Sequence, residues 1–229
     1  MKLGLRKSNR FLDFMKKLCI FDLDGTLTNT LGSISYFLNS ELEMRGLPLV
    51  SPKDIKEFTG DGARNLVERV LKKNKINDGK LLDEICSSYV ASYDKDYLYL
   101  CKLYPGIKEM VEHLEKEGVL LSCLTNKPHS TAVSIIEHFF GSSFSFVCGQ
   151  RQGFPIKPDP SGALEIMKHF GLEAKDALYI GDTATDISTG KNAKCFTIGV
   201  LWGFRDMAEL QEAGADAIIK EPREIAKFL

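Results

Sequence analysis

The stretch FDLDGTLT, residues 21–28, continues directly from the short apolar run LCIF, residues 18–21. A continuous apolar run of this length is typical of a strand in a parallel sheet that helices cover on both faces. Asp22 and Asp24 stand two positions apart, so both side chains leave the same side of the backbone if the chain stays extended. Two neighbouring carboxylates repel each other unless a cation lies between them or one stays protonated. The pair therefore indicates a metal site, or nucleophile and acid roles divided between two carboxyl groups.

The composition describes a globular chain of 229 residues, with 44% hydrophobic and 27% charged residues. A formal net charge of −1 gives no overall basic field, so we expect neither a nucleic-acid partner nor a membrane partner. No apolar run approaches the roughly 20 residues that cross a bilayer. Buried cysteines without CxxC spacing are typical of a reducing compartment, so we expect a cytoplasmic protein. The cysteines in apolar, strand-like runs are Cys19, Cys123, Cys148 and Cys195.

The chain after residue 104 alternates between strand-like and helical segments. Alternation of this kind implies right-handed crossovers and a parallel sheet between two helical layers. The strand-like runs are 119–124, 144–148, 177–180, 195–200 and 217–219, and the helical segments are 106–117, 130–139, 161–170 and 186–192.

Residues 31–104 interrupt this rhythm, because they contain no convincing strand and too much chain for one crossover helix. We therefore predict an α/β fold, a Rossmann-like parallel sheet between helices, with an inserted all-helical cap domain. The expected division is an N-terminal extension at 1–16, a core at 17–30 and 105–229, and a cap at 31–104. The helical patterns within the cap cover 34–45, 52–58, 63–73 and 80–93.

Polar side chains follow the predicted strands at the points where those strands end. In a parallel sheet, ligands bind outside the carboxyl ends of the strands, so these side chains are expected to meet in one site. They are Asp22 and Asp24 after the first strand, Thr125 and Asn126 after the second, Lys157 between the third and fourth, and Asp182 and Asp186 after the fourth.

The carboxylates in this set suit phosphoryl transfer, which needs an in-line nucleophile and neutralisation of negative charge. Asp22 would attack phosphorus to form an aspartyl-phosphate, and Asp24 would protonate the leaving oxygen and then deprotonate water. Asp22 and Asp182 would bind Mg²⁺ together with the backbone carbonyl of Asp24. Asp186 would hold a metal-bound water or orient Lys157, although it could alternatively be the N-cap of a helix.

The remaining residues of the set suit phosphate binding. The Thr125 hydroxyl and the backbone N–H groups near Gly25 and Asn126 would bind phosphate oxygens. Lys157 would supply a positive charge that offsets the crowded carboxylates and the phosphate.

These residues resemble, in chain order, the four motifs of the haloacid dehalogenase superfamily, most of whose members are aspartate-nucleophile phosphatases. DLDGTL at 22–27 resembles the first motif, Thr125 the second, Lys157 before Pro158 the third, and Asp182 with Asp186 the fourth. The superfamily's dehalogenases place another residue at the position of Asp24. The resemblance therefore implies a Mg²⁺-dependent phosphatase.

Two further segments resemble phosphoglycolate phosphatases of this superfamily. TGDGARNLV at 59–67 is similar to their cap loop, and TNKP at 125–128 is similar to their second motif. Arg64 in the cap loop would pair with a substrate carboxylate or a second phosphate. The alternative, a solvated arginine near a helix N-terminus, stays open on the sequence alone.

The expected partner is a small phosphorylated metabolite, and the expected assembly is a monomer or a small homo-oligomer. One rival is a phosphotransferase of the beta-phosphoglucomutase type, which shares the fold and the aspartyl-phosphate. Phosphatases of nucleotides or pyrophosphate share the core as well. A more distant rival is a non-catalytic binding protein on the same fold.

Overall fold

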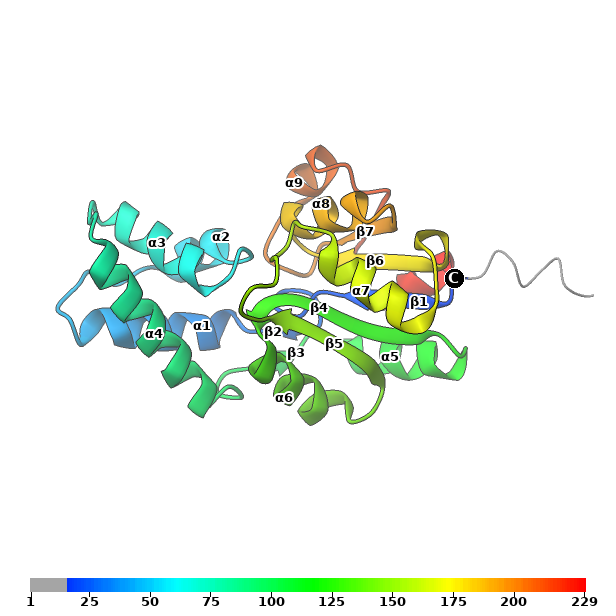
Figure 1. Cartoon of the computed structure of the whole chain (residues 1–229), viewed down its shortest axis with the longest axis horizontal. Helices are drawn as coiled ribbons and strands as arrows, with labels where there is room; N and C mark the ends of the chain where they lie inside the picture. Colours follow the sequence, from blue (N-terminus) through cyan, green and yellow to red (C-terminus); the bar gives the residue numbers. More distant parts are fainter. Residues whose placement is uncertain (1–15) are drawn as a thin grey trace, which may run out of the picture.

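A computed structural model describes residues 16–229, so the predicted extension at 1–16 lies outside the described residues except for Lys16. Within the described chain, six parallel strands form one sheet in the order β5-β4-β1-β6-β7-β8 (Figure 1). The strands are β1 (Leu18–Phe21), β4 (Leu120–Pro128), β5 (Phe144–Gln150), β6 (Ala177–Gly181), β7 (Phe196–Val200) and β8 (Ala217–Ile219).

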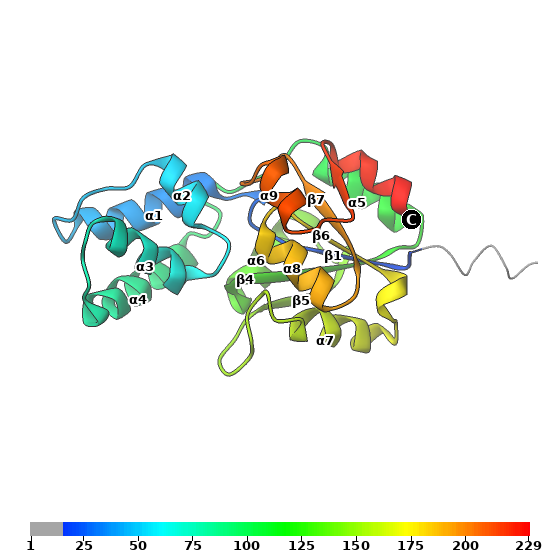
Figure 2. The ribbon, with the colours of Figure 1, turned by 90° about the horizontal axis from the view of Figure 1, so that it is seen from above.

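Helices cover both faces of this sheet, and Figure 2 shows α5 and α7 on opposite sides of the strands. One face packs against α5 (Ile107–Lys116), α6 (His129–Phe140) and a final 3-10 helix, η3 (Pro222–Phe228). The other face carries α7 (Ser161–Phe170), α8 (Ala184–Asn192) and α9 (Met207–Glu212), with a short 3-10 turn η2 (Ala174–Asp176) before β6.

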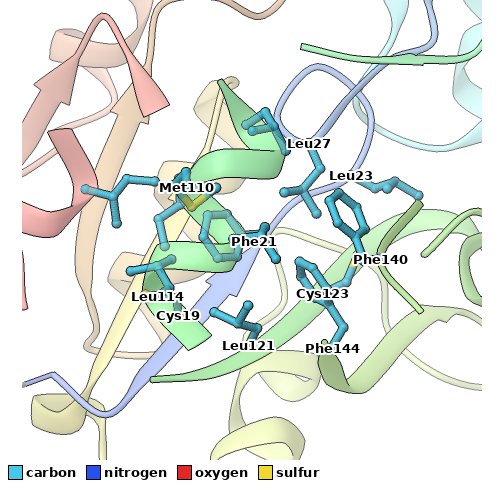
Figure 3. Packing of buried hydrophobic residues seen from close by; sticks show 14 of the residues in the cluster. Cys19, Phe21, Leu23, Leu27, Met110, Leu114, Leu121, Cys123, Phe140 and Phe144 are labelled. Carbon is cyan, nitrogen blue, oxygen red and sulfur yellow. The ribbon is translucent and has the colours of Figure 1, made fainter. Parts of the chain in front are cut away.

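The apolar run that opens the sequence forms the centre of the sheet. Cys19 and Phe21 point into the core beneath α5 and α6, as Figure 3 shows, whereas Leu18 and Ile20 pack against the α7 side. All four side chains are fully buried, since strands on both sides and helices on both faces exclude water. This placement accounts for a continuous apolar run in place of an alternating one.

The cap is a separate helical body that lies beyond the carboxyl ends of the strands (Figure 1). It consists of α1 (Leu31–Glu43), α2 (Pro52–Phe58), α3 (Ala63–Lys73) and α4 (Gly79–Lys95), which bury a hydrophobic cluster of their own. Ser51 caps α2 and Asp54 completes a capping box, so the sequence specifies that helix start locally. Two short segments connect the core to the cap, one on each side of it in the sequence. They pair with each other as the antiparallel strands β2 (Thr28–Asn29) and β3 (Lys102–Leu103).

The predicted fold class is confirmed. The structure differs at short elements: β2, β3 and α9 were not predicted, and β4 runs on to Pro128, where it pairs with Gln150 of β5. Elements this short have too little periodicity to be seen in a sequence. Within residues 16–229, every helix is too short or too polar to cross a membrane.

Candidate active site

The carboxyl ends of β1 and β4 meet the cap at one cavity. Core residues on its wall are Asp22, Asp24, Thr125, Asn126 and Lys127, and the cap contributes Thr59, Gly60, Gly62, Ala63, Leu66, Tyr89 and Tyr93. The predicted convergence of polar residues at one sheet edge is therefore seen in the structure, with the cap loop at residues 59–63 above it.

Three buried carboxylates gather beside this cavity, and Asp22 is the one of them that lines it. Oxygens of Asp22, Asp182 and Asp186 lie within 4.8 Å of one another, and all three residues are buried. Lys157 Nζ lies 2.6 Å from Asp22 Oδ1 and 2.6 Å from Asp186 Oδ1. The cluster contains one ammonium group and three carboxyl groups, so a bound cation would offset the remaining negative charge. Hard oxygen ligands in this arrangement fit Mg²⁺.

Burial and the neighbouring charges shift the pKa values of Asp22, Asp182 and Lys157. Burial, and then the charge of Asp186, raise the pKa of Asp22 well above its ordinary value and that of Asp182 to about 7. Burial alone would lower the pKa of Lys157, but the charges of Asp186 and Asp22 outweigh it and raise that pKa. Lys157 therefore stays charged next to Asp22, whose carboxyl group is harder to ionise than a free one.

We expect the affinity for Mg²⁺ to fall as the pH drops below about 7, because protons then compete with the ion for Asp182, and the raised pKa of Asp22 acts in the same direction. Each displaced proton weakens metal binding by about tenfold per pH unit. Isothermal titration of the protein with Mg²⁺ between about pH 5.5 and pH 8 measures this slope. An affinity that does not change with pH would contradict the assignment of these carboxylates as ligands.

The surroundings hold Asp182 in one orientation. Its Oδ1 accepts a hydrogen bond from Thr26 Oγ1 at 3.0 Å, and its Oδ2 accepts one from the backbone N–H of Phe204 at 2.7 Å. Gly25 has a φ of 94°, and a Cβ there would lie 2.3 Å from Asp182 Oδ2. The absence of a side chain at Gly25 thus lets the backbone after Asp22 and Asp24 approach Asp182 closely.

Asp186 does not cap its helix, which corrects the alternative considered from the sequence. The N-cap of α8 is Thr183, and Asp186 is the third residue of a capping box, accepting bonds from the N–H and hydroxyl of Thr183. Its Oδ2 is used in that box, while its Oδ1 contacts Lys157. The structure therefore supports an orienting contact between Asp186 and Lys157.

Thr125 and Asn126 lie where the sequence predicts, at the cavity wall after the apolar part of β4. The Asn126 side chain accepts a hydrogen bond from the backbone N–H of Lys157 at 2.8 Å and donates one to the carbonyl of Gly60 at 3.1 Å. Asn126 therefore links the loop that carries Lys157 to the cap loop at residues 59–63. Phosphate binding by the backbone around Asn126 and Gly25 stays a prediction.

The structure does not bring Arg64 to this site. Its side chain is exposed on α3, pairs with Asp83 of α4, and is absent from the described cavity lining. The first turn of α3 turns this side chain away from the cavity that Ala63 and Leu66 line. Its substrate role therefore stays a prediction without support from the geometry.

Lys127 is a site residue that the sequence reasoning missed. Its Nζ lies 3.1 Å from both carboxylate oxygens of Asp24 and 4.2 Å from the centre of the Tyr93 ring. Only 6% of the side chain is exposed. The charge of Asp24 raises the pKa of Lys127 although burial opposes this. The available signal was the position of Lys127, two residues after Thr125 at the end of a buried strand.

Arg205, after β7, connects the core to the cap. It donates hydrogen bonds to the carbonyl oxygens of Lys56, Glu57 and Thr59 at the C-terminal end of α2. These carbonyls have no partner within the helix, and a cation is favourable there. A second contact joins Thr185 Oγ1 to Asp61 at 2.6 Å.

We expect Arg205→Ala to speed amide hydrogen exchange at residues 52–60 by about tenfold or more. Losing hydrogen bonds from a charged donor costs about 1.5–3 kcal/mol. Hydrogen-exchange mass spectrometry makes the comparison, with Arg223→Ala as control because that exposed arginine pairs with Glu221 far from the cap. Unchanged exchange at 52–60 would show that Arg205 does not hold the cap.

Comparisons with known proteins agree with this geometry. The model of the family described as "Haloacid dehalogenase-like hydrolase" matches residues 19–200. The phosphoglycolate phosphatase of Haemophilus influenzae is 30% identical over 219 residues, which cover 93% of this chain and 98% of that protein. Phosphoglycolate phosphatase 1 of Pseudomonas aeruginosa is 28% identical, covering 94% of this chain and 80% of that protein.

A solved structure gives the same result for the fold. The crystal structure of a predicted phosphoglycolate phosphatase from Haemophilus somnus superposes with a TM-score of 0.85 at 29% sequence identity. The superposition covers 92% of this chain and 96% of that chain, so it includes both the sheet and the cap.

Proposed function

Because the chain belongs to the haloacid dehalogenase-like hydrolases, we propose that it is a Mg²⁺-dependent phosphatase acting on a small phosphorylated metabolite. The observation that supports this most directly is the buried cluster of Asp22, Asp182 and Asp186 around Lys157. Its member Asp22 lines the cavity between the core and the cap. Burying such a cluster costs free energy unless a cation compensates its charges, which favours a role in binding.

In the proposed reaction, an oxygen of Asp22 attacks phosphorus while the bond from phosphorus to the leaving oxygen breaks. Asp24 donates a proton to that oxygen, which departs as an alcohol. Asp24 then takes a proton from water, and the water oxygen attacks the aspartyl-phosphate to release phosphate and restore Asp22. Lys157 keeps Asp22 in place through its 2.6 Å contact.

The acidic cluster supplies the proposed metal ligands. Asp22 and Asp182 would hold Mg²⁺ with the Asp24 carbonyl, and Asp186 would act through water or through Lys157. When bound, the ion would neutralise charge on the transferring phosphoryl group.

Phosphoglycolate is the proposed substrate type, because the relatives named above carry that activity in their names and match over nearly the whole chain. A cytoplasmic location and a monomer or small homo-oligomer remain our proposals from the sequence. The rival substrates are sugar phosphates for a mutase, nucleotides, and the anhydride pyrophosphate.

The test is a panel of phosphoglycolate, β-glucose 1-phosphate, nucleoside monophosphates and pyrophosphate, with and without Mg²⁺. We expect Mg²⁺-dependent phosphate release that is fastest with phosphoglycolate. Phosphoryl transfer to a second sugar with little phosphate release would favour the mutase. No release from any ester in saturating Mg²⁺ would refute the phosphatase proposal and favour a binding protein.

A further inference from the structure

Lys127 is the one basic side chain on the described lining of the cavity. Lys157 lies beneath this lining and is engaged by two carboxylates, while Arg64 points away. An anionic end of a substrate other than the phosphate therefore has one cation to meet in the part of the cavity that the structure describes.

The rest of the described wall carries no positive charge. Besides the aspartates, it consists of neutral polar residues and of apolar and aromatic side chains, most of which come from the cap. Asp94 also reaches the wall, but its carboxylate accepts a hydrogen bond from Thr131 and would repel an anion. The apolar and aromatic members are Ile34, Ala63, Leu66, Tyr89, Val90, Tyr93 and Pro128.

The place of Lys127 next to Asp24 fixes where that anion would sit. In the proposed reaction, Asp24 touches the leaving oxygen. Lys127 Nζ lies 3.1 Å from both oxygens of the Asp24 carboxylate, so it is also near the leaving group. In a two-carbon acid, the carboxylate is separated from the leaving oxygen by one methylene, which places it on the same side of the site.

The cap covers one side of this ammonium, and the side chain of Lys127 is largely buried. The Tyr93 ring of α4 lies 4.2 Å from Nζ, and 6% of the Lys127 side chain is exposed. A desolvated ammonium forms stronger hydrogen bonds with a carboxylate than an exposed one does. Lys127 belongs to the core strand β4 and Tyr93 to the cap helix α4, so the contact between their side chains forms only when the cap lies on the core.

We propose that Lys127 binds the second anionic group of the substrate and selects phosphorylated small carboxylic acids over neutral esters of the same size. This inference rests on the proposed phosphatase function. It transfers to Lys127 the role that the sequence assigned to Arg64.

The test compares phosphoglycolate with ethyl phosphate, in which a methyl group replaces the carboxylate, in the presence of Mg²⁺. Wild-type protein should prefer phosphoglycolate. Lys127→Met should raise KM for phosphoglycolate by about 10- to 100-fold, the loss expected for a charge-assisted hydrogen bond, and change KM for ethyl phosphate by less than about threefold. Lys127→Arg, which keeps the charge, should retain part of the preference.

Other outcomes overturn the proposal. A fall in kcat that is equal for both esters, with KM unchanged, would mean that Lys127 acts only by positioning Asp24. Loss of the preference in Arg64→Met but not in Lys127→Met would return the role to Arg64. If wild-type protein hydrolyses neither ester, the proposed function fails before Lys127 is in question.

A second variant covers the case in which Lys127→Met does not fold. Lys127→Gln keeps a donor for Asp24 but has no charge, and it should show the same loss of preference. Inhibition by glycolate, measured with ethyl phosphate as substrate, should weaken in this variant by at least about tenfold. Unchanged inhibition by glycolate would contradict carboxylate binding by Lys127.

Discussion

Replacing Asp22 by asparagine is expected to reduce phosphate release from every ester by about 10⁴-fold or more, because an amide does not form the covalent intermediate. The shape of the side chain is kept, and the amide oxygen can still accept the hydrogen bond from Lys157. Acid quenching after mixing with labelled substrate measures the phosphoenzyme, which should be absent. Substantial turnover in this variant would disprove the nucleophile assignment.

The same change is expected to raise the melting temperature of the metal-free protein at pH 8. Burial and neighbouring carboxylates raise the pKa of Asp22, so its ionisation in the folded state costs free energy above that pKa. Asparagine carries no such charge. Asp96→Asn is the matched control, because Asp96 is exposed at the end of α4. A lower melting temperature for Asp22→Asn alone would show that the charge stabilises the site.

Replacing Lys157 by methionine should have the second large effect, and it acts on both stability and activity. Lys157 is buried and contacts Asp22 and Asp186 at 2.6 Å each. Removing one partner of a buried charge cluster costs about 3–5 kcal/mol, since the remaining charges lose their compensation. We also expect phosphatase activity to fall below detection, because Asp22 loses the contact that orients it.

The sign of the pH dependence follows from the carboxylates. Without Lys157, the pKa of Asp22 rises further, because Lys157 is the cation that lowers it. A carboxyl group whose pKa is raised by folding contributes stability when protonated and loses it as the pH rises through that pKa. The variant should therefore be less destabilised near pH 5 than near pH 8, and Mg²⁺ should restore part of the loss at pH 8.

Urea unfolding of wild-type and variant protein at both pH values measures these differences. Lys168→Met is the matched control, because Lys168 is exposed on α7 and the same atoms are removed there. Equal stability of Lys157→Met and wild-type protein at pH 8 would mean that Lys157 does not stabilise the cluster of Asp22, Asp182 and Asp186.

The residues that sequence reasoning placed correctly share one property: they follow strands. Asp22, Thr125 and Asp182 come directly after buried apolar runs, and parallel strands bring such positions to one edge. This inference does not require the order of the strands within the sheet, because every parallel strand ends at the same edge. The residue pattern and the resemblance pointed to the same acidic cluster, and the structure assembles it.

The residues that sequence reasoning missed or misplaced depend on how the cap lies on the core. Arg64 and Lys127 are both cations near motif residues, and a sequence does not show which of them faces the cavity. The rotation of α3 turns Arg64 outward to Asp83, whereas β4 continues past its apolar part and carries Lys127 to Asp24. Arg205 was also missed, because its bonds are to backbone carbonyls, which any sequence provides.

The central place of β1 has a consequence for the order in which this chain folds during synthesis. Leu18 pairs with Leu120 of β4 and with Ala177 of β6, so β1, the first strand within residues 16–229, waits about 100 residues for its first neighbour during synthesis. The cap helices, whose contacts are local, can form in that interval. Until β4 emerges, the apolar run at 18–21 has no native partner strand, and a chaperone that covers it would protect the nascent chain from aggregation.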